Sequence, residues 1–185
     1  MNATLTSTLR VFAENDGSKP VLDTTDRSEI ARILNAEGIV FEQWEASVPL
    51  AADATQDQIL AAYAHEIDRL KAQYGYTTVD VIRVTPQTPN IPALREKFLS
   101  EHTHSEDEVR FFVEGSGSFY LHIKDKVYQM IGTRGDLLSV PAGTTHWFDM
   151  GPAPEFAAIR LFVDPSGWVA QFTGDAIAAR FPKFE

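Results

Sequence analysis

The feature that most constrains this fold is a two-residue hydrophobic period in the second half of the chain. From about residue 88 onward, apolar and polar side chains alternate in short runs, which is typical of half-buried strands. Turn-forming sequences at 115–117, 124–126, 132–135 and 141–143 separate these runs. The predicted strands are 109–113, 118–123, 127–131, 137–140, 145–149 and 156–163. Short strands at this regular spacing predict a mainly β fold, an antiparallel sandwich or small barrel.

The first 87 residues combine helical and extended patterns. Thr55 and Gln58 form a capping box, and apolar residues then recur at helical spacing until Gly75, which can end a helix in the left-handed conformation. The other expected elements are a helix at 26–37, a strand at 79–84 and a closing helix at 168–180. We expect one domain over 1–185, in which a mixed α/β part at 1–87 packs on a β core at 88–165 and a C-terminal helix occupies 166–185.

Composition excludes several classes of protein. The 185 residues include 16 basic and 26 acidic side chains, and the net charge of −10 would repel nucleic acid and anionic lipid. The absence of cysteine excludes disulfides, thiolate zinc sites, iron–sulfur clusters and cysteine nucleophiles. No stretch approaches the roughly 20 apolar residues of a membrane span, and the N-terminus lacks the apolar run of a signal peptide. We therefore expect a cytoplasmic protein that binds neither nucleic acid nor membranes.

Four residues form a candidate metal site. His102 and His104 are separated by one residue, so on an extended chain their side chains point to the same side. Glu108 could join them once the chain turns, and His146 follows a strand and tight turn that can return it across the barrel. Neutral imidazole nitrogens are good ligands for iron, nickel, cobalt or zinc. Three nitrogens and one carboxylate on an octahedral ion leave two adjacent positions open, which is typical of a catalytic site.

The remaining histidines are better explained as structural residues. The chain contains five histidines, so a His-x-His pair can arise by chance and is weak evidence alone. His65 lies off the apolar stripe of its helix, which indicates a surface position. His122 alternates with apolar neighbours in a strand, so we expect it at the surface or supporting the site from outside the ligand set.

The alternation of side chains along a strand places an arginine near the metal. If Glu108 points inward, Arg110 and Phe112 point inward too. A buried arginine is costly unless an anion meets it. Arg110 therefore either neutralises an anionic substrate or forms an internal ion pair with Glu114 or another carboxylate.

Two phenylalanines and a second arginine complete the candidate pocket. Phe148 shares a face with His146, and Phe98 shares one with His102 if that stretch is extended. Together they would form an apolar wall beside the metal, although core packing explains each of them alone. Arg160 interrupts an apolar strand and is a second candidate for binding an anionic substrate.

The spacing of these blocks resembles the two signature motifs of the cupin superfamily. The first block contains the His-x-His pair and Glu108, and the second keeps the spacing G-x5-P-x-G-x2-H from Gly135 to His146. The resemblance covers about 96–150 and implies a jelly-roll β-barrel that binds a metal. Glu96 and Met150 stand where the usual pattern has Gly and Asn, and neither position is a ligand.

A closer resemblance spans most of the chain. The sequences at 98–104, 107–113, 140–149 and 159–162 resemble the acireductone dioxygenases of the methionine salvage pathway, as do those at 38–39 and 41–44. The resemblance implies metal ligation by His102, His104, Glu108 and His146, stabilisation of a substrate dianion by Arg110, and a pocket lined by Phe98 and Phe148. It also links Glu101 to metal incorporation and Asp107 to the relay of conformational change.

The same resemblance implies a reaction between dioxygen and an acireductone, a 1,2-dihydroxy-3-keto-pentene with a terminal methylthio group. One Fe(II) per chain would give the 2-keto acid precursor of methionine and formate, whereas Ni(II) would give methylthiopropionate, carbon monoxide and formate. Family habit also implies a monomer. Two alternatives stay open: a cupin-type isomerase or epimerase of a sugar or keto acid, and a non-catalytic cupin that binds a small molecule or metal.

Overall fold

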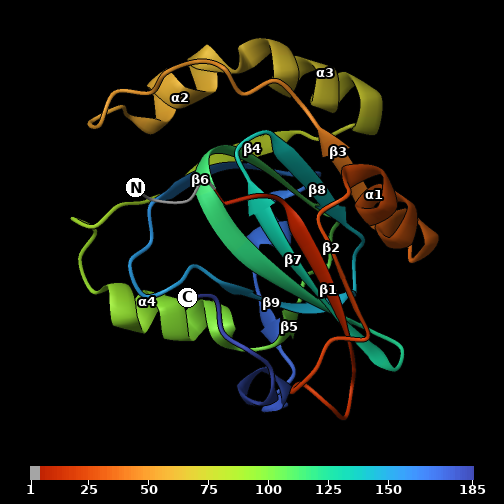
Figure 1. Ribbon diagram of the computed structural model, residues 1–185. Helices are drawn as coiled ribbons and strands as arrows, with labels where there is room; N and C mark the ends of the chain where they lie inside the picture. Colours follow the sequence, from red (N-terminus) through yellow and green to blue (C-terminus); the bar gives the residue numbers. More distant parts are fainter. Residues whose placement is uncertain (1–4) are drawn as a thin grey trace.

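The computed structural model describes residues 5–185, whose strands form two antiparallel sheets that share one long strand (Figure 1). The strands are β1 (Thr8–Ala13), β2 (Leu22–Thr24), β3 (Val40–Gln43), β4 (Thr78–Val84), β5 (His102–Thr103), β6 (Glu108–Ile123), β7 (Lys126–Thr133), β8 (Asp136–Val140), β9 (Thr145–Asp149), β10 (Phe156–Phe162) and β11 (Gln171–Phe172). The helices are α1 (Arg27–Ala36), α2 (Gln56–Ala62), α3 (Ala64–Tyr74) and α4 (Ile91–Leu99), with 3₁₀ turns η1 (Pro165–Trp168) and η2 (Ile177–Arg180).

The long strand β6 joins the two sheets. Sheet A has the order β11-β5-β9-β6-β7-β1-β2, and sheet B has the order β3-β8-β6-β10-β4. The strand passes from sheet B to sheet A near Gly115, where φ is +66° and a side chain would collide with the Glu155 carbonyl. Buried residues of both sheets, such as Phe119 and Leu138, share one apolar core. The expected mainly β fold with flanking helices is confirmed, and two sheets around one core agree with the expected jelly roll.

The sequence separated 109–113 from 118–123, and here the structure differs. The chain does not turn at 115–117 but continues as one strand, in which Gly117 pairs with Gly132 of β7. A side chain on Gly117 would collide with the ring of Phe148, and one on Gly132 would collide with Phe112. These glycines therefore allow aromatic rings to approach the strands closely and do not form turns.

The first 87 residues contribute strands to both sheets as well as helices. β1 pairs with β7 and carries β2 at the edge of sheet A, while β3 and β4 form the two edges of sheet B. Helices α2 and α3 lie over sheet B (Figure 1), where Ile59 and Leu70 pack with Phe111 and Ile159. This region therefore completes the β core and does not only pack on it.

The helix ends follow local sequence signals, but one long helix is divided. The capping box of Thr55 and Gln58 opens α2, and Gly75 ends α3 with a φ of +76°. The helix expected between them breaks at Tyr63, whose φ is −112°. Tyr63 is 1% exposed and packs edge-on against Phe111 at 5.7 Å between ring centroids. We attribute the break to this inward anchor, because it lets both helical pieces keep apolar side chains on sheet B.

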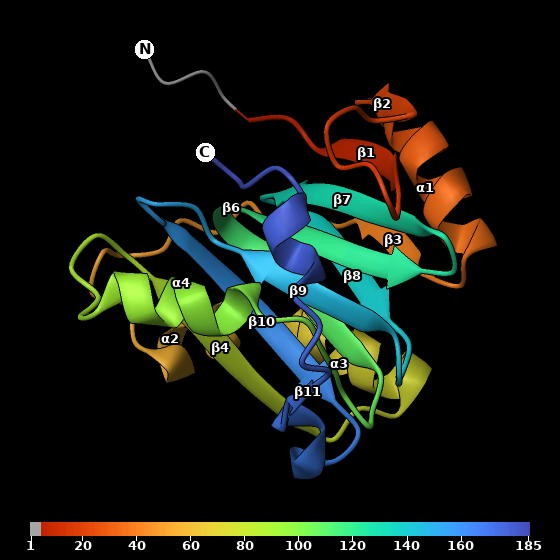
Figure 2. The same ribbon diagram turned by 90° about the horizontal axis from the view of Figure 1, so that it is seen from below.

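The closing helix expected at 168–180 does not form, and that prediction is wrong. The segment contains η1, the short strand β11 and η2 instead. Gly174 has a φ of +78°, a conformation that interrupts a helix, and Gln171 and Phe172 pair with β5 instead. Strand β11 extends β5 at the edge of sheet A, while α4 packs beside β9 (Figure 2).

Candidate metal centre

Three histidines meet between the sheets. His102 lies on β5, directly opposite His146 of β9, and His104 follows β5 by one residue. Their side chains each offer one ring nitrogen, and these three atoms lie within 4.8 Å of one another. All three residues are buried, with 8% or less of their surface exposed. The structure therefore brings together the three histidines that the sequence pattern selected.

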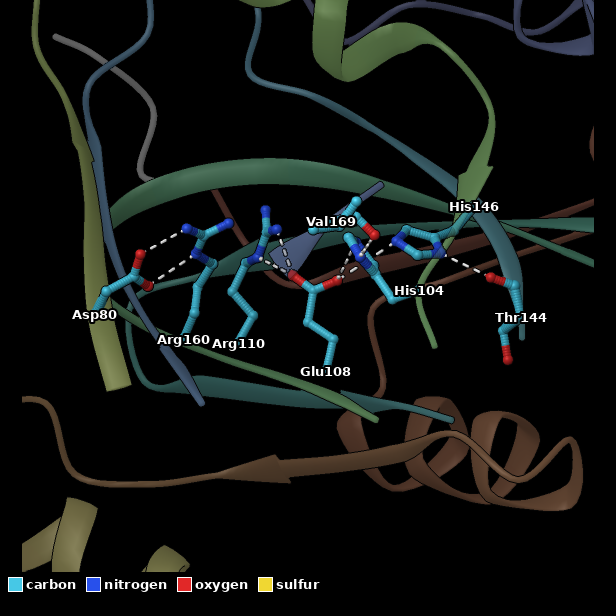
Figure 3. Close-up of polar contacts among 8 residues, drawn as sticks. All are labelled: Asp80, His104, Glu108, Arg110, Thr144, His146, Arg160 and Val169. Atoms are coloured by element: carbon cyan, nitrogen blue, oxygen red, sulfur yellow. Dashed lines mark hydrogen bonds and ion pairs between the residues drawn. The ribbon is translucent and has the colours of Figure 1, made fainter. Parts of the chain in front are cut away.

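Backbone carbonyls fix the orientation of each imidazole ring. The Nδ1 atoms of His102 and His146 contact the carbonyl oxygens of Ser100 and Thr144 at 2.8 Å. His104 Nδ1 contacts the Val169 carbonyl oxygen at 3.3 Å (Figure 3). A carbonyl only accepts hydrogen bonds, so each Nδ1 carries the proton and donates it. Each Nε2 therefore keeps its lone pair for another ligand, which is the usual arrangement of metal-binding histidine.

The surroundings of His102 and His104 favour the neutral form of these two rings. Burial, with a smaller contribution from His146 close by, lowers the pKa of His102 to about 4. Burial also lowers the pKa of His104, although the nearby Glu108 carboxylate opposes the shift. A neutral imidazole is the form that binds a metal.

The carboxylate of Glu108 faces the histidines on one side and an arginine on the other. Glu108 Oε2 lies 3.4 Å from the Nε2 atoms of both His104 and His146. Glu108 Oε1 accepts hydrogen bonds from Arg110 Nη2 at 2.5 Å and Nε at 3.2 Å. Burial alone would raise the pKa of the Glu108 carboxyl, but the positive charge of Arg110 beside it holds this pKa well below its usual range. The carboxylate is therefore ionised.

This arrangement fits a cation. With Nδ1 protonated, the Nε2 lone pairs of His104 and His146 point toward an ionised oxygen, so acceptors face acceptors. Within residues 5–185, Glu108 Oε2 and His146 Nε2 are buried without any hydrogen-bond partner. Buried polar atoms are nearly always satisfied, and a metal ion would satisfy both at once.

A cavity of about 650 Å³ lies beside the histidines and has one apolar and one cationic wall. Phe98 and Phe148 form part of the apolar wall, with ring centroids 6.0 Å apart. Phe98 belongs to α4 and not to an extended segment, so the expectation that it shares a strand face with His102 is wrong. The residue nevertheless lines the cavity. The helix had only weak signals in the sequence, chiefly Pro92 in its first turn.

The cationic residues that line the cavity are Arg83, Lys97, Arg110 and Arg160. Arg110 is 6% exposed, and its guanidinium carbon lies 4.6 Å from the ring centroid of Phe119 and 4.9 Å from that of Phe148. Burial lowers the pKa of Arg110, while the Glu108 carboxylate opposes this. The ion-pair partner of Arg110 is thus Glu108 and not Glu114, which pairs with Arg83.

Two other candidates lie away from the cavity. Glu101 points to the opposite face of sheet A, where its Oε2 lies 2.8 Å from His122 Nδ1. Asp107 accepts a hydrogen bond from the Ala142 amide at 2.8 Å, in the turn before His146. Both therefore contact segments that carry ligands, and neither lines the cavity. His65 is exposed on α3, as its position in the helical pattern indicated.

The sequence reasoning missed residues that come from distant segments. Trp168 and Phe172 line the cavity, and the Phe172 ring lies 5.8 Å from that of His102. Both were missed because the sequence analysis assigned their segment to a C-terminal helix. Asp80 forms an ion pair with Arg160. In the sequence, the indication of its role was its place as the one acidic residue in the β-branched run 79–84.

These features define a class: a metal-binding protein of the cupin type, with three buried histidines between the sheets of a β fold. The sequence model of the ARD/ARD' family matches residues 8–170. The acireductone dioxygenase of Hahella chejuensis is 56% identical over 97% of this chain and 96% of that protein. That of Pseudomonas aeruginosa is 56% identical over 97% of this chain and 99% of that protein. The chain therefore belongs to the acireductone dioxygenase family, as its sequence resemblance implied, and it is an enzyme.

A solved structure agrees with this membership. Acireductone dioxygenase from Bacillus anthracis, with a cadmium ion in its active centre, superimposes with a TM-score of 0.79. It is 32% identical in sequence, and the match covers 92% of this chain and 100% of that one. Within residues 5–185, no helix is long and apolar enough to span a membrane.

Proposed function

We propose that this chain cleaves an acireductone, 1,2-dihydroxy-3-keto-5-methylthiopentene, with dioxygen as a step of methionine salvage. Family membership supports the reaction. The observation that carries it is the pair of unsatisfied atoms at the candidate metal site, His146 Nε2 and Glu108 Oε2, which are buried without a partner among the described residues. The adjoining cavity combines apolar side chains with cationic ones, Arg110 and Arg160 among them, which suits a small anion that has an apolar tail.

We propose His102, His104, Glu108 and His146 as the ligands of one Fe(II) or Ni(II) ion per chain. Nitrogen and carboxylate donors without a thiolate accept either ion. When bound, the metal supplies open coordination positions for two substrate oxygens and positive charge that favours loss of their protons. Each backbone carbonyl at Nδ1 holds its histidine ring in the orientation that ligation requires.

Arg110 is proposed as the catalytic residue that stabilises the substrate dianion. Its Nη1 is buried without a hydrogen-bond partner within 5–185, so it can donate to a substrate oxygen while Nε and Nη2 hold Glu108. Phe98 and Phe148 would exclude water and hold the apolar tail, and Arg160 would add a second positive charge. The low dielectric of a buried site strengthens these charge interactions.

Glu101 and Asp107 are proposed to act through other residues. Asp107 anchors the turn that precedes His146, and Glu101 precedes His102 and ties β5 to β6 through His122. Both would keep ligand-bearing segments in place and would not contact substrate. This interpretation agrees with the roles that the family resemblance implies, metal incorporation for Glu101 and the relay of conformational change for Asp107.

The test is oxygen uptake by metal-free protein that is reloaded separately with Fe(II) and Ni(II). Fe(II) should yield the 2-keto acid and formate, and Ni(II) should yield methylthiopropionate, carbon monoxide and formate. Anaerobic turnover of a sugar or keto acid would instead favour an isomerase. A lack of oxygen uptake with both metals would overturn the dioxygenase proposal.

We also propose that the protein is a cytoplasmic monomer. The absence of cysteine agrees with a reducing compartment, and family habit supports the monomer. Light scattering after size-exclusion chromatography and cell fractionation test these two points.

A further inference from the structure

Asp80 forms a two-pronged ion pair with Arg160, which lines the cavity. Arg160 Nε donates to Asp80 Oδ1 at 2.9 Å, and Nη2 donates to Oδ2 at 2.6 Å. The two residues lie directly opposite each other on β4 and β10. The Arg160 side chain is only 17% exposed and lines the cavity, so the pair holds a cation where a ligand can reach it.

The pair continues a row of charges across three strands. Arg160 lies directly opposite Arg110 of β6, and Arg110 in turn binds Glu108 (Figure 3). The row therefore has an anion at each end, Asp80 and Glu108, and two neighbouring cations between them, Arg160 and Arg110. Two neighbouring guanidinium groups repel each other, and each outer carboxylate offsets one of them. The four charges cancel, so a divalent metal would leave two positive charges for a dianion to neutralise.

Each guanidinium keeps one edge available. Asp80 and Glu108 both bind the Nε and Nη2 atoms of their arginines, so Nη1 makes no protein hydrogen bond on either residue in the described chain. Arg110 Nη1 is buried, and both arginines line the same cavity. Two N–H edges that converge on one space suit an oxyanion.

A surface pair of the same type shows what Asp80 adds. Arg10 and Asp23 also lie directly opposite each other, on β1 and β2, but they share a single contact of 3.1 Å. Their side chains are 38% and 50% exposed, so that pair faces solvent. Asp80 instead fixes both the position and the plane of the Arg160 guanidinium.

We propose that Asp80 is a positioning residue that aligns Arg160 beside Arg110, so that the two arginines together bind the dianionic enediolate of the substrate. The inference rests on the proposed function, because the substrate supplies the two negative charges. Asp80 itself acts only through Arg160 and does not touch the substrate.

The test is a double-mutant cycle on the metal-loaded enzyme. Wild type, Asp80→Asn, Arg160→Ala and the double variant are titrated anaerobically with the acireductone, and the absorbance of the bound enediolate gives Kd. Asp80→Asn should raise Kd about 10-fold, which is typical for loss of a hydrogen bond to a charged group. The double variant should bind no more weakly than Arg160→Ala, because Asp80 acts through Arg160. Metal content should equal that of wild type in all variants.

Asp23→Asn is the matched control and should leave Kd unchanged. Arg160→Lys keeps the charge but cannot form both bonds to Asp80, so it should raise Kd by less than Arg160→Ala does. This variant also carries the test if Asp80→Asn does not fold, since equal binding by Arg160→Lys and wild type would refute the alignment. An unchanged Kd in Asp80→Asn, or additive effects in the double variant, would overturn the role of Asp80. Failure of the proposed function is distinct, because wild type itself would then neither bind the acireductone nor consume oxygen.

Discussion

Two clusters of glutamate and histidine lie on the two sides of sheet A, one between the sheets and one on its outer face. The inner cluster contains the candidate ligands, including His102 and Glu108. The outer cluster contains Glu101 and His122. The two are close in the chain and in the sheet, since Glu101 precedes His102 and His122 pairs with Thr145, the neighbour of His146. Residue type and closeness along the chain therefore do not distinguish them.

The clusters differ in how their bonding capacity is used. In the outer cluster, Glu101 Oε1 accepts from Thr173 Oγ1 and Oε2 contacts His122, both at 2.8 Å. His122 Nε2 lies 3.5 Å from Glu14 Oε1. The inner cluster keeps Glu108 Oε2 and His146 Nε2 buried and without partners among residues 5–185. Between these two clusters, unused bonding capacity, and not the mere presence of histidine, distinguishes the one that can receive a ligand.

The largest expected effect separates the two faces by metal content. His146→Ala should abolish stable metal binding, because loss of a ligand exceeds the roughly 10- to 100-fold cost of changes beyond the ligands. His122→Ala, its outer counterpart, should keep the metal. Metal analysis after dialysis measures both. Full occupancy in His146→Ala, or loss of metal in His122→Ala, would contradict the comparison.

Arg110→Ala should separate substrate binding from metal binding within the inner cluster. Loss of one charge-assisted contact to a buried anion costs on the order of 2–4 kcal/mol, or roughly 30- to 1000-fold in turnover. The metal should stay bound because no ligand is removed. Arg110→Lys should recover only part of the activity, since lysine has no planar fork. Wild-type turnover in Arg110→Ala would make this residue a structural partner of Glu108.

Acid should lower the folding stability of the metal-free protein through His102 of the inner cluster. The pKa of His102 is lowered to about 4 from 6.5, so the unfolded chain takes up a proton between these values while the folded chain does not. Folding stability from this group is therefore full above pH 6.5 and falls as the pH decreases toward 4, by on the order of 3 kcal/mol. Urea unfolding of the metal-free protein at several pH values measures this fall. His102→Gln should make the curve flatter in that interval, and an unchanged slope would refute the assignment.

The smallest effect is expected on the outer face. Glu101→Gln should keep the metal and lower the free energy of unfolding by about 1–2 kcal/mol, because one charge-assisted hydrogen bond weakens. Glu14→Gln is the control, since Glu14 is 46% exposed at its side chain and should change little. Thermal melting and metal analysis together decide the case. Loss of metal in Glu101→Gln would give this residue a direct part in metal incorporation.

The sequence predicted strands best where one face is buried and the period of two is unbroken. The runs 137–140 and 145–149 match β8 and β9 closely for this reason. The prediction failed at 115–117, where Gly117 serves close ring packing within β6, and at 168–180, where β11 pairs with β5 and Gly174 has a φ of +78°. In both places a contact with a distant segment decided the local conformation.

The sequence by itself selected the candidate donors, because local spacing fixes the side to which neighbouring residues point. His102, His104 and Glu108 could be selected this way, and the pattern from Gly135 to His146 supplied the fourth candidate. It also determined family membership, since the matching blocks extend over most of the chain. Only the tertiary structure decided the partners: Asp80 meets Arg160 across 80 residues, and the Val169 carbonyl orients His104 across 65. Strand register sets the contact between Asp80 and Arg160, and register depends on the packing of the whole sheet.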